Sequence, residues 1–544
     1  MGSGKVDRRD FLKYVIGGAS LMALDWSSLP RATGAFLKED EYDAIIIGSG
    51  LGGLSCGAAF ARQGYKVLVV EQHDRPGGYA TTFQRPGGFT FDVSLHSTSV
   101  GERNGVYNLI SGFPEITDVE FVQHPNLYRV IFPEHDIRVP QKDIEAYIKM
   151  LQNYYPQEKD GIRELFKDME GLTNDIVKLS NAHGQIDMSR FPTDFPYLFA
   201  FYNKTWKNMV DARLKDEKLK AIVSAQWGYY GLPPSKLVSF YYALPAIGYL
   251  TQGGYYPIGR SQKISDALAR YIDAHGGKVM LSTRIENIVL KDHAACGVTA
   301  QTGEKFMSKV VVSNASPYET FRKMMNEEVY LKEYLEKLDK YSVSLSSFQI
   351  FLGLKDDVVG RSGVKDSEIF FNPSYDIEGD YLSAVNCNMD NPGFAVSLYD
   401  NIYKGYSPEG KNTLNILTIE GYEHWKPYES DYFNGNKTEY RKEKERIADI
   451  LIEKAEKTLL PGLSAAIEVK EIGTPLTNVR YTRNYRGAIY GWDQTVDNSG
   501  NNRLPHDTPI KNLFLAGAWT RPGHGYGSVI SSGLECFSQI VKGW

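Results

Sequence analysis

The chain has 544 residues, a formal net charge of −5 at pH 7, and 42% hydrophobic and 23% charged residues. This length is too great for one ordinary hydrophobic core and predicts two domains, or one cofactor domain with a large insertion. The composition is that of a globular protein, and the acidic balance gives no reason to expect a nucleic-acid partner. The four cysteines show neither CxxC pairing nor metal-ligand spacing, so we expect no metal site.

The first 36 residues are predicted to be an export signal or a membrane tether outside the fold. Residues 7–13 (DRRDFLK) resemble a twin-arginine export signal, with Asp7 where that signal usually has Ser or Thr. The apolar run at 14–24 is too short for an ordinary transmembrane helix. Because the twin-arginine route carries folded, cofactor-loaded proteins, we expect export across the cytoplasmic membrane to the periplasm or cell surface, with or without membrane association.

Residues 42–92 contain the parts of a dinucleotide-binding βαβ unit. An apolar strand at 44–47 precedes the turn GSGLGG at 48–53, a small-residue helix is expected at 54–63, and a second strand at 67–70 ends at Glu71. The glycines permit a tight turn, close approach to a pyrophosphate and close helix packing, and the carboxylate can accept a hydrogen bond from a ribose hydroxyl. The predicted cofactor contacts here are Gly48, Gly50, Gly52, Gly53 and Glu71.

Two further glycine-rich turns follow strands far apart in the chain. Paired glycines lie in the first turn at 74–83, before a strand at 88–93, and β signals at 278–281, 285–290, 297–300 and 305–313 predict a third Rossmann strand, a β-meander and a return strand. A buried strand at 512–515 leads to the second turn at 521–528 and a closing helix at 529–541, whose N terminus can hold negative charge. The predicted cofactor contacts in these turns are Gly77, Gly78, Tyr79, Ala80, Gly517, Gly525, Tyr526 and Ser528.

These segments predict an α/β chain with a Rossmann-type FAD/NAD(P)-binding domain that is discontinuous in sequence. We assign residues 40–130, 251–320 and 480–544 to that domain. Residues 131–250 and 321–479 are then an inserted α+β domain that faces the substrate or a membrane.

The fingerprint, together with Phe91-Asp92 and Leu515-x-Gly517, resembles the glutathione-reductase-type FAD fold. Residues 77–83 (GGYATTF), 89–96 (FTFDVSLH) and 522–525 (PGHG) resemble the phytoene desaturase, carotenoid isomerase and retinol saturase branch. The resemblance covers about 42–95, 253–318 and 480–544. Tyr79 stands where related amine oxidases carry Arg, which argues against an amine oxidase, and Ser94 stands where this branch commonly has Gly.

The resemblance implies non-covalent FAD and an oxidoreductase that desaturates, saturates or isomerises carbon–carbon bonds of an apolar isoprenoid, carotenoid-like or lipid substrate. With a single dinucleotide fingerprint, we expect a quinone, another electron carrier or oxygen as the redox partner. The aromatic segments at 191–202 and 238–250 are expected to line an apolar tunnel or to contact a membrane surface, and ordinary core packing is the alternative.

The expected catalytic groups lie near the glycine-rich turns. His96 and His524 are the best titratable candidates for proton transfer beside the flavin, and Arg521 could pair with an anionic substrate or with reduced flavin. Three other functions remain open: a redox-neutral cis–trans isomerase that uses reduced FAD, a non-catalytic lipid-binding escort of the same fold, and a flavin amine oxidase. The sequence does not identify the substrate, the direction of electron flow or the oligomeric state.

Overall fold

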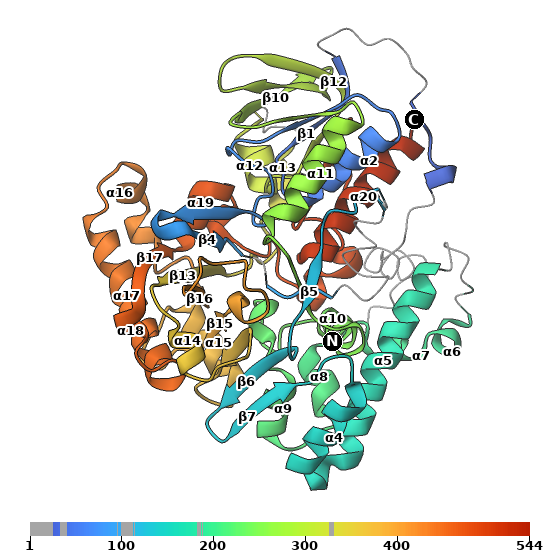
Figure 1. Ribbon diagram of the computed structural model, residues 1–544. Coiled ribbons are helices and arrows are strands. Elements are labelled where there is room, and N and C mark those ends of the chain that lie inside the picture. The colour runs from blue at the N-terminus through green and yellow to red at the C-terminus, as the bar shows by residue number, and fades with distance from the viewer. Residues whose placement is uncertain are drawn as a thin grey trace.

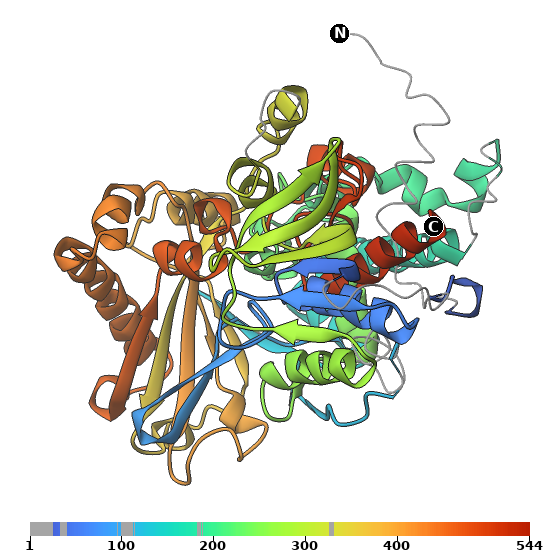
Figure 2. The same cartoon turned by 90° about the horizontal axis from the view of Figure 1, so that it is seen from above.

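The computed structural model describes residues 26–32, 41–94, 96–99, 112–113, 115–181, 187, 189–325 and 331–544. The predicted export signal lies almost entirely outside these ranges, as does Leu95 of the segment 89–96. The described chain has the expected α/β fold, with two seven-stranded sheets and a lobe of helices (Figures 1 and 2). No helix within these ranges is both long and apolar enough to cross a bilayer.

The first sheet contains the Rossmann unit. Its strand order is β10-β11-β12-β1-β2-β9, and β18 pairs with β12. The parallel pairs β1·β2, β1·β12, β2·β9 and β12·β18 confirm the predicted third Rossmann strand and return strand. The antiparallel pairs β10·β11 and β11·β12 confirm the predicted meander. The strands are β1 (Glu41–Ile47), β2 (Val67–Val70), β9 (Lys278–Met280), β10 (Ile285–Lys291), β11 (Ala294–Ala300), β12 (Lys305–Ser313) and β18 (Leu513–Leu515).

Helices and the meander cover opposite faces of this sheet. Ala44 and Ile46 pack in the core formed with α2, α11 and α20, whereas Ile45 and Ile47 pack with the meander, α12 and α13. Burial on both faces explains why β1 is a continuous apolar run, as is typical of parallel strands. The helices are α2 (Leu51–Arg62), α11 (Gln262–Ala274), α12 (Pro317–Arg322), α13 (Lys332–Leu338) and α20 (Tyr526–Lys542).

The second sheet has the order β17-β13-β16-β15-β14-β6-β7. Residues of β13 alternate between its faces: Phe348 and Ile350 enter the core beneath α17, while Gln349 borders a large cavity. The strands are β6 (Tyr128–Phe132), β7 (His135–Val139), β13 (Ser346–Leu354), β14 (Glu368–Phe371), β15 (Phe394–Ser397), β16 (Asn412–Glu420) and β17 (Ile467–Gly473). The nearby helices are α14 (Val358–Arg361), α15 (Ile377–Val385), α16 (Glu429–Phe433), α17 (Thr438–Thr458), α18 (Leu463–Ala466) and α19 (Pro475–Thr482).

A helical lobe adjoins the second sheet (Figure 1). Residues of its helices α5 and α10 border the cavity. The core of the lobe is made by amphipathic helices such as α5, which packs against α10 and α7. The helices are α4 (Ile144–Tyr154), α5 (Lys159–Asn181), α6 (Phe191–Asp194), α7 (Pro196–Phe201), α8 (Trp206–Asp211), α9 (Glu217–Val223) and α10 (Ser239–Gln252).

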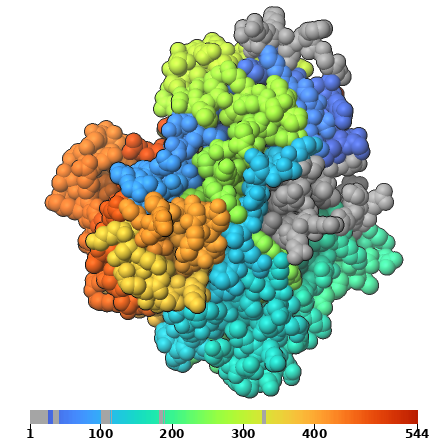
Figure 3. Space-filling model, viewed as in Figure 1, coloured from blue at the N-terminus to red at the C-terminus, as the bar shows by residue number. Residues whose placement is uncertain are grey.

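Two small pairs of strands complete the fold. The hairpin of β3 (Thr82–Arg85) and β4 (Phe89–Asp92) lies at the surface, where it is blue in Figure 3. It lies between the orange part of the chain around the second sheet and the green part that contains α11 and the meander. The sequence predicts β4 but not β3, which is short and carries polar residues. The second pair joins β5 (Phe121–Gln123) to β8 (Tyr255–Pro257).

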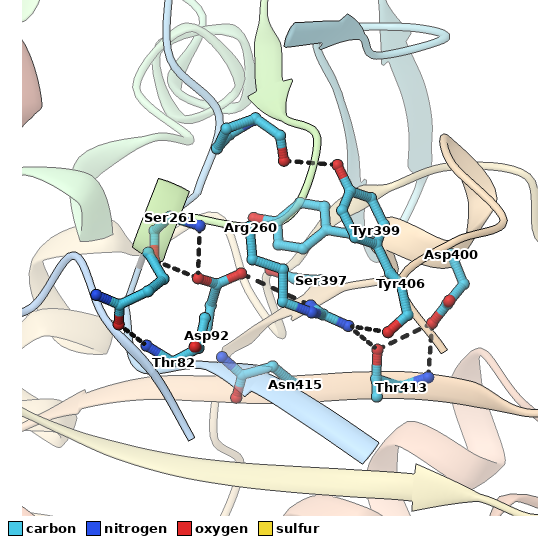
Figure 4. A network of polar contacts seen from close by, with 12 residues as sticks. Thr82, Asp92, Arg260, Ser261, Ser397, Tyr399, Asp400, Tyr406, Thr413 and Asn415 are labelled. Carbon is cyan, nitrogen blue, oxygen red and sulfur yellow. Dashed lines mark hydrogen bonds and ion pairs between the residues drawn. The ribbon is translucent and has the colours of Figure 1, made fainter. Parts of the chain in front are cut away.

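A buried ion pair fixes the hairpin to the rest of the protein (Figure 4). Asp92 accepts a hydrogen bond from the Ser261 N–H at 3.0 Å and another from its hydroxyl, and lies 3.6 Å from the Arg260 guanidinium. Arg260 in turn donates to the Tyr406 carbonyl and to the Thr413 hydroxyl. The network therefore ties β4 to the start of α11 and to the second sheet.

The second sheet contains a buried carboxyl that predicts a pH-dependent stability. Burial raises the pKa of Glu420 to about 8, while the Trp425 indole N–H donates to this group at 2.7 Å. The unfolded carboxyl has a pKa of about 4.3, so this stabilising contribution is complete below that pH and is lost as pH rises through about 8. The free energy of unfolding should fall by up to about 1.4 kcal/mol per pH unit more steeply in wild type than in Glu420→Gln. Thermal unfolding between about pH 5 and pH 8 checks this, and parallel stability curves would contradict it.

Candidate active site

The first glycine turn joins β1 directly to α2. Gly48 has a φ of 91°, and Gly50 is the N-cap of α2, which begins at Leu51, earlier than predicted. A Cβ on Gly53 would lie 2.1 Å from the Gly48 carbonyl oxygen, so only glycine lets the helix pack on the turn. Gly48, Gly50 and Gly52 border the cavity, whereas Gly53 does not. The turn therefore directs the positive end of α2 into the cavity, where a pyrophosphate is favoured.

Glu71 lies at the end of β2 and borders the same cavity. Its Oε2 accepts hydrogen bonds from the N–H and hydroxyl of Ser49, both at 2.8 Å, and its Oε1 accepts one from the His73 N–H at 2.9 Å. A carboxylate has about four lone-pair sites, so one site on Oε1 remains for a ribose hydroxyl. Ser49, in the variable position of the turn, thus orients Glu71, a role that the sequence pattern alone does not show.

The paired glycines pack against the first turn. Gly77 forms a parallel bridge with Gly50, and its N–H donates to the Ser49 carbonyl at 2.9 Å. A Cβ on Gly78 would lie 3.2 Å from the Gly50 Cα. Tyr79 and Ala80 follow and border the cavity. The second predicted turn is therefore brought beside the first.

An asparagine that the sequence pattern does not single out lies between the first turn and the C-terminal turn. Asn314, which follows β12, lies between Gly48 and Gly517: its Nδ2 donates to the Gly48 carbonyl at 3.4 Å, and a Cβ on Gly517 would lie 2.3 Å from its Oδ1. Gly525 is the N-cap of α20, and Tyr526 and Ser528 border the cavity with Gly517 and Gly525. The position of Asn314 at the carboxyl end of a parallel strand is the signal that could have identified it.

These turns border one cavity of about 1380 Å³. That volume exceeds the roughly 300–1,000 Å³ of most small-molecule sites, so a dinucleotide and a second ligand both fit. The predicted aromatic segment at 238–250 forms α10 and contributes Phe240, Leu244 and Ile247 to the lining. The segment at 191–202 forms α6 and α7 and lies outside the lining. Among the described residues, no group of His, Cys, Asp and Glu is arranged to hold a metal ion.

His524 borders the cavity inside an aromatic enclosure. Its ring centroid lies 5.0 Å from that of Tyr241 and 4.4 Å from that of Tyr490. Within the described part of the chain, its Nε2 has no hydrogen-bond partner. Burial, reinforced by the charge of Arg503, holds the pKa of His524 well below its usual value. The imidazole is therefore neutral at physiological pH and can accept a proton.

His96 borders the same cavity. Its Nδ1 lies 3.2 Å from the Ser397 hydroxyl, and its ring centroid lies 5.5 Å from that of Tyr229. Burial lowers the pKa of His96, although the nearby Glu368 opposes this change. Both predicted histidines are thus neutral groups on the cavity wall.

The structure does not bring Arg521 to the cavity. Its guanidinium donates to the main-chain carbonyls of Asn501 at 2.7 Å and Arg503 at 3.3 Å, and it is absent from the lining. The expected pairing of Arg521 with substrate or reduced flavin does not fit this position. Its neighbour Arg503, which the sequence analysis did not select, is instead the buried cation that lowers the pKa of His524.

Comparison with known proteins agrees with this geometry. The family model of flavin containing amine oxidoreductases matches residues 51–540. The chain is 29% identical over 516 residues to prolycopene isomerase 2 of an Oncidium hybrid cultivar, covering 93% of this chain and 84% of that protein. It is 28% identical over 542 residues to all-trans-retinol 13,14-reductase of Danio rerio, covering 92% and 86%. It is also 26% identical over 523 residues to the neurosporene-forming phytoene desaturase of Rhodobacter capsulatus, covering 92% and 93%.

Solved structures share the fold at lower identity. An oxidoreductase from Methanosarcina mazei has a TM-score of 0.60 and 17% identity over 90% of this chain and 99% of that one. Putrescine oxidase bound to putrescine has a TM-score of 0.59 and 14% identity over 92% and 98%. The family match spans most of the chain and includes Glu71, the paired-glycine turn and the C-terminal turn. The chain therefore belongs to the flavin containing amine oxidoreductase family and is an FAD-dependent oxidoreductase.

Proposed function

We propose that this protein desaturates, saturates or isomerises carbon–carbon double bonds of an apolar polyene of the carotenoid or retinoid kind. The observation that carries the proposal is the cavity, in which glycine turns suited to a dinucleotide continue into an apolar wall formed by α10. The relatives that share most of the chain are named for prolycopene, retinol and phytoene. An apolar wall binds a neutral polyene by removing its surface from water.

FAD, when bound, supplies hydride transfer. The chain's own residues would hold the polyene along α10 and exclude water from the reacting carbons. The neutral imidazoles of His96 and His524 would accept the proton that accompanies hydride transfer, and in the reverse direction the protonated imidazole would deliver it. Tyr241, which donates to the His524 carbonyl at 2.6 Å, would keep the segment carrying that imidazole in place.

An anaerobic half-reaction tests the proposal and separates its versions. A purified protein that binds FAD should be yellow, and a colourless protein that refuses added FAD would support a lipid-binding escort. Oxidation of the reduced flavin by an added polyene indicates a saturase, and reduction of the oxidised flavin indicates a desaturase. A change of double-bond geometry while the flavin stays reduced indicates an isomerase. Reduction by amines, with no response to polyenes, would support an amine oxidase and contradict the proposal.

Replacement of the two histidines tests their proton-transfer role. We expect His96→Ala or His524→Ala to lower kcat about 100-fold, because general acid–base groups contribute on that scale. Both variants should keep the wild-type ratio of flavin to protein absorbance, since neither imidazole belongs to the predicted FAD contacts. Wild-type turnover in both variants would end this assignment.

We also propose that the protein is exported in folded form and passes electrons to or from a quinone or another carrier. Arg8 and Arg9 in the twin-arginine-like segment support export, and the single dinucleotide fingerprint supports a separate electron carrier. Cell fractionation of the full chain and of an Arg8→Lys/Arg9→Lys variant tests export, because only the wild type should leave the cytoplasm. Sedimentation with lipid vesicles tests peripheral membrane contact, and flavin reoxidation by a soluble quinone tests the carrier.

A further inference from the structure

A buried carboxylate stands directly behind one wall of the cavity. Glu368, the first residue of β14, is 3% exposed and does not border the cavity itself. Its Oε1 accepts hydrogen bonds from the Ser97 N–H and the Tyr399 hydroxyl, both at 2.8 Å, and its Oε2 accepts one from the Tyr229 hydroxyl. Three donors are therefore directed at the two carboxylate oxygens.

This charge has no cationic partner in the described part of the chain: the ion pairs there include none to Glu368. Two histidines, His96 and His124, feel the charge of Glu368, and burial lowers the pKa of both. Neutral imidazoles leave the negative charge of Glu368 uncompensated. In an apolar, water-poor wall such a charge acts over a longer distance than it would in water.

A tyrosine connects this carboxylate to the cavity. Tyr229 borders the cavity, and its hydroxyl donates to Glu368, so this one residue reaches both the ligand space and the charge. Tyr249, which also borders the cavity, donates its hydroxyl to the Ser97 carbonyl at 2.8 Å. The faces of tyrosine rings carry partial negative charge and attract cations. This part of the wall is therefore electron-rich.

We propose that Glu368 and Tyr229 form an electronegative wall that stabilises positive charge developing on the polyene during the reaction. The inference rests on the proposed function. In desaturation, a C–H bond breaks, its hydrogen and both electrons pass to oxidised FAD, and the remaining allylic cation loses a proton to a base such as His96. In saturation the steps run in reverse: the base, once it has taken a proton from solvent, would give that proton to the double bond, and the resulting cation would take hydride from reduced FAD. In isomerisation the same protonated base would give its proton, the bond would rotate, and the base would take the proton back.

All three reactions pass through a cationic polyene, so the wall serves each of them. The neutral polyene in the ground state gains little from a nearby negative charge, whereas the cationic transition state gains much. Interactions of this kind raise kcat and leave KM nearly unchanged. Tyr229, which borders the ligand space, would be the catalytic residue, and Glu368, which acts through it, the positioning residue.

Binding of a charged analogue to the FAD-loaded protein tests the wall without turnover. The probes are a geranylgeranyl chain that ends in trimethylammonium and the same chain ending in tert-butyl, which has the same shape without charge. Wild type should bind the ammonium at least about tenfold more tightly, the scale of a desolvated cation–π contact. Glu368→Gln should remove most of that preference and leave tert-butyl binding unchanged. Tyr229→Phe, which keeps the ring, should reduce the preference partly.

Glu420→Gln is the matched control, because it replaces another buried carboxyl outside the cavity, and it should keep the wild-type preference. We also expect Glu368→Gln to lower kcat about 100-fold with little change in KM, and an unchanged flavin spectrum shows that it is folded. A wild-type protein with no preference for the ammonium, or a Glu368→Gln protein that retains it, overturns the inference. If wild type still turns over polyenes when one of these two results is found, the inference fails but the proposed function stands. If wild type prefers the ammonium probe but turns over no polyene, the proposed function fails and the electronegative wall stands.

Discussion

The Gly53→Ala protein is expected to be purified largely without FAD. The added Cβ would lie 2.1 Å from the Gly48 carbonyl oxygen and 3.3 Å from the Asn314 Cβ, and the backbone carbonyl cannot rotate away as a side chain would. The start of α2 must then shift outward, which costs about 1–3 kcal/mol in a packed site. That shift moves the N–H groups that face the pyrophosphate, so the dissociation constant of FAD should rise at least about tenfold.

The ratio of flavin to protein absorbance after purification measures this loss, and titration of the apoprotein with FAD measures the dissociation constant. Gly228→Ala is the matched control, because a Cβ there would meet nothing within 4 Å and Gly228 does not border the cavity. It should bind FAD as wild type does. A yellow Gly53→Ala protein with the wild-type flavin ratio would show that the tight contact between α2 and the first turn is dispensable.

The sequence predicts the parts of the fold whose signal is local. The strand, glycine turn and helix around Gly48–Gly53 lie within one stretch, and the alternation of β12 and the apolar run of β1 are visible in a few residues. The predicted helices begin too late because the glycine-rich pattern extends the turns past Leu51 and Tyr526, whereas Gly50 and Gly525 are the N-caps. Local patterns thus locate the elements, with errors at their ends.

The residues that the sequence analysis missed act through distant contacts. Glu368 meets the Ser97 N–H across 271 residues, and Asn314 meets Gly48 across 266. No spacing rule connects such pairs. The position of Arg521 beside a glycine turn predicts a site residue, but adjacency in sequence does not fix the direction of a side chain. The neighbouring main-chain carbonyls bind its guanidinium instead.

The Arg503→Met protein is expected to be strongly destabilised. Arg503 is fully buried, and it donates to the carbonyls of Thr520 at 2.9 Å, Trp492 at 3.2 Å and Ala518 at 2.5 Å. Burial lowers its pKa to about 10, so the guanidinium is still charged at neutral pH. Methionine fills similar space but leaves these carbonyls without donors, each at a cost of about 1–3 kcal/mol. We expect the free energy of unfolding to fall by about 3 kcal/mol or more, measured by urea unfolding.

Arg361→Met should change the same free energy by less than about 0.5 kcal/mol, because Arg361 is 61% exposed and pairs with Asp356 at the surface.

A second effect of Arg503→Met on the pH–rate profile separates the charge of Arg503 from its hydrogen bonds. Arg503 helps to hold the pKa of His524 down, so Arg503→Met should raise that pKa. The acidic limb of the pH–rate profile should then move to higher pH. Arg503→Lys keeps the positive charge and should leave that limb near its wild-type position. If the profile of Arg503→Met does not move, the proton that limits the rate is not carried by His524, and the neutral His96 beside Tyr229 becomes the group through which proton transfer must pass.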